Sequence, residues 1–140
     1  MIAYFDTSAI VPLLVDEPGT GQCQDHWREA NRLVSVRLAH VEARAAIAQA
    51  FRTNRITDPH MRTSVRELDA LLGQLDIIEV DAELIGRAAA LAESQALRAY
   101  DAVHLAGALT VVAEDLVVVA GDRSLLAAAE AAGLTTARIG

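Results

Sequence analysis

Residues 116–120 read Leu-Val-Val-Val-Ala and are followed at once by Gly121 and Asp122. The run is short, rich in β-branched residues and free of polar alternation, so it predicts a strand buried on both faces in the centre of a sheet. Such strands are typical of parallel sheets that are covered by helices. An acid directly after the strand lies at its carboxyl end, where open α/β sheets bind their ligands.

The rest of the chain alternates similar short strands with helical stretches, which is typical of an α/β fold with a parallel sheet. Strands are expected at Ile2–Phe5, Leu33–Val36, Ile77–Val80, Leu116–Ala120 and Thr135–Ile139. Helices are expected at Ser8–Val15, Thr20–Ala30, Leu38–Thr53, Pro59–Leu75, Ala82–Gln95, Ala99–Ala113 and Asp122–Ala132. We therefore predict one domain over residues 1–140, a three-layer αβα sandwich with a central parallel sheet of about five strands.

Local signals mark several helix ends. Asp58 is the expected N-cap of the helix that begins with Pro59, because aspartate caps well and proline suits the first helical position. Asp81 is the expected N-cap of the helix that follows it. Gly133 is the expected stop after the last helix, since glycine readily takes the left-handed conformation that ends helices.

The charge balance narrows the function. The 140 residues carry 12 basic and 19 acidic side chains, for a net charge of −7. This argues against a protein that grips nucleic acid through a broad basic face, yet it allows a nucleic-acid enzyme whose acids hold cations. All 12 basic residues are arginine, which excludes mechanisms that need a lysine, such as a Schiff base or a P-loop.

Other features concern the cellular compartment. The single cysteine, Cys23, excludes an internal disulfide and a cysteine-based zinc site. No basic region precedes the N-terminal apolar run, which Asp6 interrupts, so no secretion signal is expected. The longest nearly uncharged stretch, Ala102–Ala113, has 12 residues, short of the roughly 20 that cross a bilayer. These features predict a cytoplasmic protein with no membrane association.

Four acids occupy positions where a carboxylate is costly or well placed for chemistry. Asp6 and Asp122 come directly after the first and fourth expected strands, at their carboxyl ends. Glu42 and Asp101 share helix faces with apolar residues, where an isolated carboxylate would cost several kcal/mol (roughly) to bury. Each acid also has an ordinary structural explanation, as a helix N-cap or as the partner of an arginine. The arginines that could pair with them are Arg44, Arg98 and Arg123.

Together the four acids suggest metal chemistry. Carboxylates crowded at one sheet edge would raise one another's pKa unless a cation lay between them. Mg²⁺ and Mn²⁺ prefer oxygen ligands, so the set favours a carboxylate-only site for these ions over a zinc site. Metal ions held by acids suit phosphodiester hydrolysis. His104, three residues after Asp101, could shuttle protons or could be packed and hydrogen-bonded, and both roles stay open.

Four segments of the chain resemble the motifs of PIN-domain nucleases. They are Asp6–Ile10 (DTSAI), Glu42 in the third expected helix, Tyr100–Ala106 (YDAVHLA) and Gly121–Leu126 (GDRSLL). At this size, the chain is similar to the toxin half of a VapBC-type toxin–antitoxin pair over residues 2–138. The resemblance implies a PIN-like fold and an endoribonuclease that cuts RNA with bound Mg²⁺ or Mn²⁺. It also implies a homodimer and a cognate VapB-type antitoxin that blocks the site.

The resemblance assigns roles to particular residues. Ser8 would be a supporting hydroxyl near Asp6. The family usually has Thr or Ser two residues before the acid that matches Asp122, and this chain has Ala120 there. The match is therefore weakest around Asp122. The residues that the family uses as catalytic groups and metal ligands match Asp6, Glu42, Asp101 and Asp122.

The arginines next to these acids in the sequence are candidates for binding the RNA substrate, because a guanidinium group suits phosphate. The alternative role for each arginine is a salt bridge that orients a carboxylate. The candidates are Arg44, Arg98 and Arg123.

Other function classes are weaker or stay open. A haloacid-dehalogenase-type phosphatase needs a second Asp where this chain has Ser8, and it needs a lysine, as does a receiver domain. A non-catalytic PIN-like module that binds RNA or protein stays open, as does an RNA-processing nuclease unrelated to toxin–antitoxin function. A small antitoxin-like reading frame beside the gene would favour the toxin.

Overall fold

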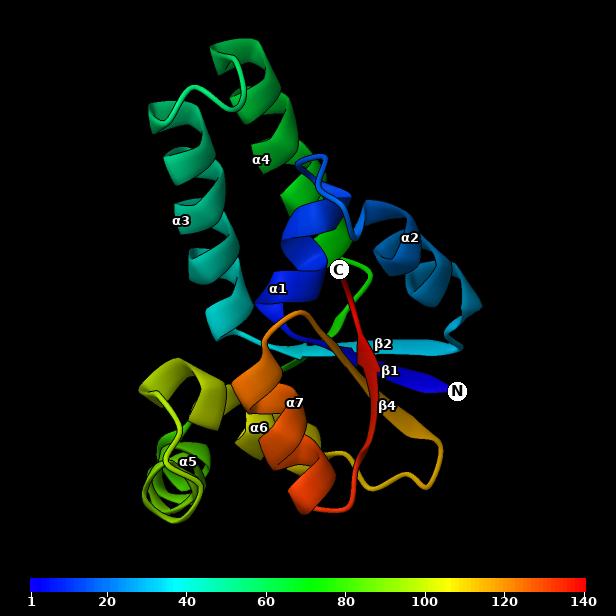
Figure 1. The fold of residues 1–140 in the computed structure, drawn as a ribbon, viewed down its shortest axis with the longest axis vertical. Helices are drawn as coiled ribbons and strands as arrows, with labels where there is room; N and C mark the ends of the chain where they lie inside the picture. Colours follow the sequence, from blue (N-terminus) through cyan, green and yellow to red (C-terminus); the bar gives the residue numbers. More distant parts are fainter.

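The computed structural model describes residues 1–140 and contains a parallel sheet with helices on both faces (Figure 1). Its five strands lie in the order β3-β2-β1-β4-β5. They are β1 (Ile2–Phe5), β2 (Arg32–Val36), β3 (Asp76–Ile78), β4 (Leu116–Ala120) and β5 (Thr135–Arg138). The chain thus starts in the middle strand, winds to one edge and returns to the other side of β1. The expected αβα sandwich is confirmed.

Two groups of helices cover the sheet. Their bounds are α1 (Thr7–Ile10), α2 (Thr20–Glu29), α3 (Leu38–Arg52), α4 (Asp58–Leu72), α5 (Ala82–Ser94), α6 (Ala99–Thr110) and α7 (Arg123–Ala131). Figure 1 shows α1 to α4 on one side of the sheet and α5 to α7 on the other. None of these helices combines the length and the apolar run that a membrane span requires.

A separate apolar core fills each side of the sheet, because consecutive strand residues point to opposite faces. In β4, Val118 packs into the core beneath α5, α6 and α7, whereas Val119 packs into the core beneath α1 to α4. In β1, Tyr4 and Phe5 divide in the same way. The double burial expected for residues 116–120 is therefore confirmed, although β1 and not β4 is the central strand. The return crossover after β3 places β4 beside β1.

Some expected boundaries were wrong for local reasons. The helix expected at Ser8–Val15 is α-helical only to Ile10 and continues as a 3₁₀ turn over Val11–Leu13, because Pro12 has no N–H for the α-helical ladder. The N-cap of α4 is Thr57, whose hydroxyl accepts a hydrogen bond from the His60 amide, and Asp58 is already helical.

Other helices end earlier than expected. Helix α4 ends at Leu72, just before Gly73, and α6 ends at Thr110, where Val111 is already extended. Glycine favours helix less than the leucine before it, and the β-branched residues Thr110 and Val111 are both weaker helix formers than the alanine and leucine of the preceding turn. The expected stop after α7 is confirmed, since Gly133 has a φ of +87°.

Parallel pairing places the functional segments at one edge of the sheet. Phe5 pairs with Val119, so Asp6 leaves β1 beside the end of β4, where Gly121 and Asp122 follow. Because helix α6 ends near the start of β4, the first turn of α6 lies at the carboxyl edge of the sheet. Helix α3 starts there as well, directly after β2. The sheet register thus gathers four distant segments.

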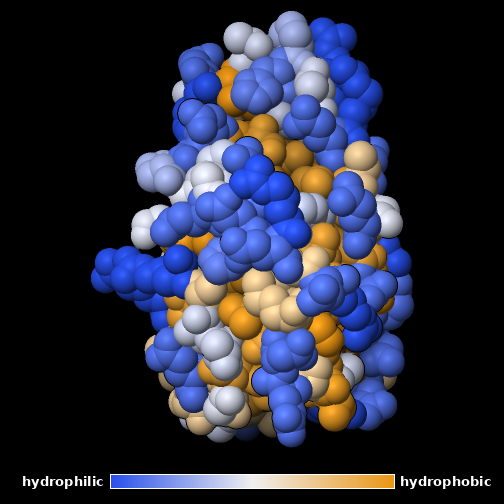
Figure 2. All heavy atoms as spheres, turned by 90° about the vertical axis from the view of Figure 1, so that its right-hand side faces the viewer, coloured by the Kyte–Doolittle hydropathy of each residue, from blue (hydrophilic) through white to orange (hydrophobic).

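The outer face on the right-hand side of Figure 1 carries both hydrophilic and hydrophobic residues. Figure 2 shows that hydrophilic side chains cover much of this face, with apolar side chains visible between them.

Candidate active site

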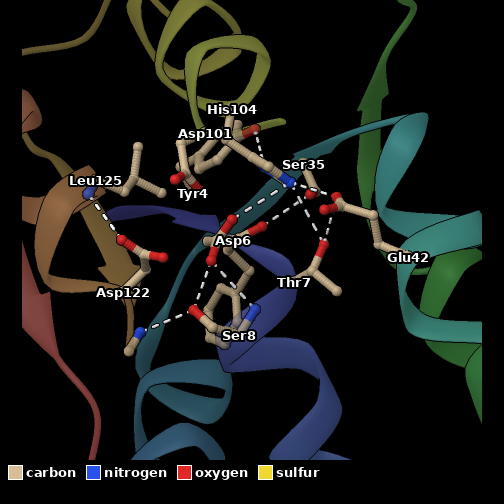
Figure 3. A network of polar contacts seen from close by, with 12 residues as sticks. Tyr4, Asp6, Thr7, Ser8, Ser35, Glu42, Asp101, His104, Asp122 and Leu125 are labelled. Carbon is tan, nitrogen blue, oxygen red and sulfur yellow. Dashed lines mark hydrogen bonds and ion pairs between the residues drawn. The ribbon is translucent and has the colours of Figure 1, made fainter. Parts of the chain in front are cut away.

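The carboxyl edge of the sheet opens into a pocket of about 510 Å³. The residues that line it come from the start of α1, from α3, from the start of α6 and from the end of β4: Asp6, Thr7, Ser8, Glu42, Arg98, Ala99, Tyr100, Asp101 and Asp122. The fold therefore brings together all four acids that the sequence singled out. Most of them lie close together in Figure 3.

Asp6 is held rigidly at the end of β1. Its carboxylate caps α1 by accepting hydrogen bonds from the backbone amide of Ser8, at 3.1 Å, and from the Ser8 hydroxyl. The Ser8 hydroxyl in turn accepts a hydrogen bond of 2.8 Å from the Gly121 amide. One serine thus joins the first turn of α1 to the end of β4, as expected of a supporting hydroxyl near Asp6.

Asp101 and Asp122 both line the pocket and share one arginine as a partner. Asp122 caps α7, accepting from the Leu125 amide at 3.0 Å. Arg98 spans the two acids, with its Nε 3.2 Å from Asp101 Oδ2 and its Nη2 2.9 Å from Asp122 Oδ2. Burial raises the pKa of Asp101, and the negative charges of Asp122 and Asp6 raise it further, against the opposing effect of Arg98.

Glu42 reaches the pocket from α3 and is oriented by two side chains. Thr7 donates its hydroxyl to Glu42 Oε1 at 2.9 Å, and His104 Nε2 lies 2.7 Å from the same oxygen. His104 Nε2 also lies 3.3 Å from Asp6 Oδ1, so one imidazole lies between two carboxylates from different elements (Figure 3).

His104 is the buried centre of this network. Its side chain is fully enclosed, and its Nδ1 lies 2.9 Å from the hydroxyl of Tyr4. Burial opposes the positive charge of the ring, but the hydrogen bond to Glu42 and the charges of Asp6, Glu42 and Asp101 outweigh it and raise the pKa of His104. Of the two roles left open for His104, this geometry favours the packed and hydrogen-bonded one.

The three candidate arginines separate in space. Arg98 lines the acidic pocket. Arg44 is exposed on α3 and borders an apolar groove beside Val41 and Val80, away from the acids. Arg123 is exposed in the first turn of α7, although its sequence neighbour Asp122 lines the pocket. A salt bridge to the motif acids, the alternative role considered for all three, is present for Arg98.

The sequence analysis did not single out two members of the network, Tyr4 and Thr7. The position of each relative to Asp6 could have indicated it. Tyr4 precedes Asp6 by two residues along β1, and residues at that spacing share a face of a strand. Thr7 follows Asp6 directly and opens α1, so its side chain also starts at the carboxyl edge.

The chemistry of the pocket fits a hard divalent cation. The structure holds no group of three or more acidic, histidine or cysteine side chains already arranged around one metal position. The lining nevertheless supplies carboxylate oxygens from Asp6, Asp101, Asp122 and Glu42, which are the donors that Mg²⁺ and Mn²⁺ prefer. Burial raises the pKa of Asp101, and the negative charges of Asp122 and Asp6 raise it further; a cation between these acids would relieve their repulsion.

The fold and the pocket define an α/β protein with acids gathered at the carboxyl edge of a parallel sheet. Residues 3–131 match the PIN domain. The chain is also 38% identical to Ribonuclease VapC49 of Mycobacterium tuberculosis (strain ATCC 25618 / H37Rv) over 136 residues, which cover 97% of this chain and 94% of that protein. The chain belongs to the PIN-domain family, as its motifs predicted.

Solved structures share the fold. The crystal structure of PAE2754 from Pyrobaculum aerophilum has a TM-score of 0.72 at 22% identity and covers 97% of this chain and 83% of that chain. VapBC-5 from Mycobacterium tuberculosis, a member of the VapBC family of toxin–antitoxin systems, has a TM-score of 0.64 at 18% identity and covers 98% of both chains.

Proposed function

We propose that this protein is a metal-dependent endoribonuclease and the toxin of a type II toxin–antitoxin pair. The observation that carries the proposal is the pocket at the carboxyl edge of the sheet, where Asp6, Glu42, Asp101 and Asp122 meet. Membership of the PIN-domain family and the 38% identity to Ribonuclease VapC49 support the same activity. RNA is the proposed substrate, and hydrolysis of its phosphodiester bonds is the proposed reaction.

The four acids are the proposed ligands of Mg²⁺ or Mn²⁺. When bound, such an ion supplies Lewis-acid catalysis and lowers the pKa of a water that attacks the phosphodiester. The chain itself keeps the ligands oriented. Ser8 holds Asp6, whereas Thr7 and His104 hold Glu42. Such supporting hydrogen bonds reduce the reorganisation that metal binding requires.

The arginines have different proposed roles in binding RNA. Arg98 lies at the pocket itself and is the best placed to contact the phosphate next to the scissile bond, because a guanidinium can donate two parallel hydrogen bonds to a phosphate. Arg44 and Arg123 are exposed outside the pocket, so they are suited only to more distant phosphates of a bound RNA.

The proposed protein partners are a VapB-type antitoxin and a second copy of the chain. The fold shared with VapBC-5, a member of a toxin–antitoxin family, supports the antitoxin. An antitoxin segment that covers the acidic pocket would block access of RNA. For the homodimer, Val41 of α3 supports an apolar contact, because its side chain is exposed beside the groove that Leu38 and Val80 line.

The proposal is tested by cleavage of total cellular RNA with the purified, antitoxin-free protein. Reactions contain Mg²⁺, Mn²⁺ or EDTA, and the variants Asp6→Asn and Asp101→Asn serve as controls for contaminating nucleases. We expect discrete fragments that require the metal, and a loss of rate of at least roughly a hundredfold in either variant. Asp101→Asn is expected to fold with an unchanged or higher Tm in metal-free buffer, because it removes a negative charge from a crowded pocket. Asp6→Asn is also expected to fold, but no rise in Tm is expected of it, because it removes a carboxylate that faces the buried His104.

Two outcomes would contradict the assignment. A variant that keeps full activity would remove its residue from the catalytic set. No cleavage with either metal, by protein shown to be folded, would instead favour a non-catalytic module that binds RNA or protein.

A further inference from the structure

Arg98 is the one basic side chain among the residues that line the acidic pocket. Its guanidinium contacts two carboxylates from different elements, Asp101 in α6 and Asp122 after β4, at 3.2 and 2.9 Å. It therefore does for these two acids what a metal cation would do, because it places a positive charge between them.

The backbone conformation at Arg98 places its side chain beside the first turn of α6, where Asp101 lies. Arg98 is the N-cap of α6 with extended φ and ψ of −64° and 154°, and Asp101 lies three residues further on. Its side chain is 79% exposed, whereas the side chains of Asp101 and Asp122 are only 11% and 22% exposed. The acids are thus fixed in the wall of the pocket, while the guanidinium approaches them from solvent and can leave without disturbing the core.

We propose that Arg98 is an internal counter-ion that holds the metal position in the metal-free protein and is displaced when a divalent cation binds. This inference rests on the proposed metal-dependent function. A guanidinium and a divalent cation repel each other, and both would be attracted to the carboxylates of Asp101 and Asp122. Ion pairs of so exposed an arginine are weak, so the exchange is accessible at ordinary metal concentrations.

Displacement also gives the guanidinium a second task. Once released, it stays tethered beside the pocket with its donors free, and such a planar fork can bind a phosphate through two parallel hydrogen bonds. One residue then couples the arrival of the metal ion to the capture of the substrate phosphate.

The experiment measures Mn²⁺ binding by calorimetry in the wild-type protein, in Arg98→Gln and in Arg123→Gln. Arg123 is a matched control, because it lies next to Asp122 and is exposed but has no acidic partner. Both variants lose one positive charge, yet only Arg98→Gln loses the competing contacts. We expect Arg98→Gln to bind Mn²⁺ roughly threefold to tenfold more tightly than wild type. Arg123→Gln should change the affinity by less than about twofold, because salt screens distant exposed charges.

Thermal unfolding provides a second readout. Without metal, Arg98→Gln should have a lower Tm than wild type, because Asp101 and Asp122 lose their counter-ion. The difference should vanish as Mn²⁺ saturates both proteins, since the metal then neutralises the same acids. Arg98→Lys, which keeps the charge but not the fork, should bind Mn²⁺ with an intermediate affinity and provides a test if the glutamine variant fails to fold.

The outcomes separate this inference from the proposed function. If wild type binds Mn²⁺ and cleaves RNA but Arg98→Gln has equal or weaker metal affinity, the counter-ion role is wrong and the nuclease assignment stands. If only Arg98→Gln binds Mn²⁺, the counter-ion role is supported in its strongest form. If no variant binds metal and wild type cleaves no RNA, both fail.

Discussion

His104 shows how much a single residue contributes to the arrangement of this pocket. Its imidazole is enclosed between Tyr4 on one side and the carboxylates of Glu42 and Asp6 on the other. With a proton on each nitrogen, the ring donates to partners on both sides, so the charged form suits its surroundings. A buried charge with partners of this kind is costly to disrupt, because removing one partner leaves the others unpaired.

The stability of the metal-free protein should therefore depend on the protonation of His104. The pKa of His104 in the folded protein lies above its ordinary value of 6.5, so the folded state binds the proton more tightly than the unfolded chain. This stabilisation is fully present below the unfolded pKa and is lost as pH rises through the folded pKa. Urea unfolding at a series of pH values from about 6 upward should show stability falling as the pH rises above about 6.5, by at most ~1.4 kcal/mol per pH unit.

Two variants test whether the titration of His104 causes this dependence of stability on pH. His104→Gln should be less stable than wild type and should lose this part of the pH dependence. His60→Gln should retain it, because His60 is an exposed residue on α4. An unchanged slope in His104→Gln would assign the pH dependence to another group.

Among the elements, α6 packs closely against the sheet next to the site. A Cβ on Gly107 of α6 would lie 2.4 Å from Val36 Cγ1 and 3.1 Å from the hydroxyl of Tyr4. Glycine is therefore required here for close approach of the helix to β2 and β1, and not for its backbone freedom. The same approach sets the depth at which His104 meets Tyr4.

Gly107→Ala should destabilise the protein by about 1–3 kcal/mol, although alanine favours helix, because overpacking forces Val36 and Tyr4 to shift. Gly86→Ala in α5 is the matched control, since an added Cβ there meets no atom within 4 Å. It should stabilise the protein by about 0.5–1 kcal/mol through helix propensity. Denaturant unfolding of both variants measures the contrast, and equal effects would show that α6 can move away from the sheet.

At the scale of the whole molecule, charge is distributed so that little basic surface is left for RNA. The net charge is −7, and many arginines are paired with acids, as in the pairs formed by Arg28, Arg32, Arg37, Arg55, Arg62, Arg87 and Arg98. An RNA substrate of the proposed nuclease would therefore be held by few contacts near the pocket.

A weak dependence of RNA binding on salt follows from this distribution. For a single-stranded RNA bound in the presence of metal to the Asp6→Asn variant, which we expect not to cleave it, the slope of log K against log salt should be no steeper than about −3. Fluorescence anisotropy over a range of salt concentrations measures this slope. A slope near −7 (roughly) would instead require many neutralised phosphates and a basic face that one chain does not present.

Much of the fold was predictable because its signals are local. Apolar runs such as 116–120 identify strands, and Asp81 and Gly133 mark helix ends through hydrogen bonds and backbone preferences within a few residues. Asp6 and Asp122 were found for the same reason, since each directly follows a strand and caps the next helix. Boundaries at Pro12 and Thr57 were wrong where two local preferences competed.

The sequence alone thus determined the class of fold, excluded mechanisms that need a lysine, and singled out the four acids that line the pocket. Only the tertiary structure decided which side chains orient those acids and which arginine reaches them. Thr7, Glu42 and His104 meet from three elements, and Arg98 instead of Arg44 or Arg123 bridges Asp101 and Asp122. Such contacts depend on the register of parallel strands and on how closely α6 packs on the sheet, which arise from packing between segments that are distant in the chain and leave no local periodicity to detect.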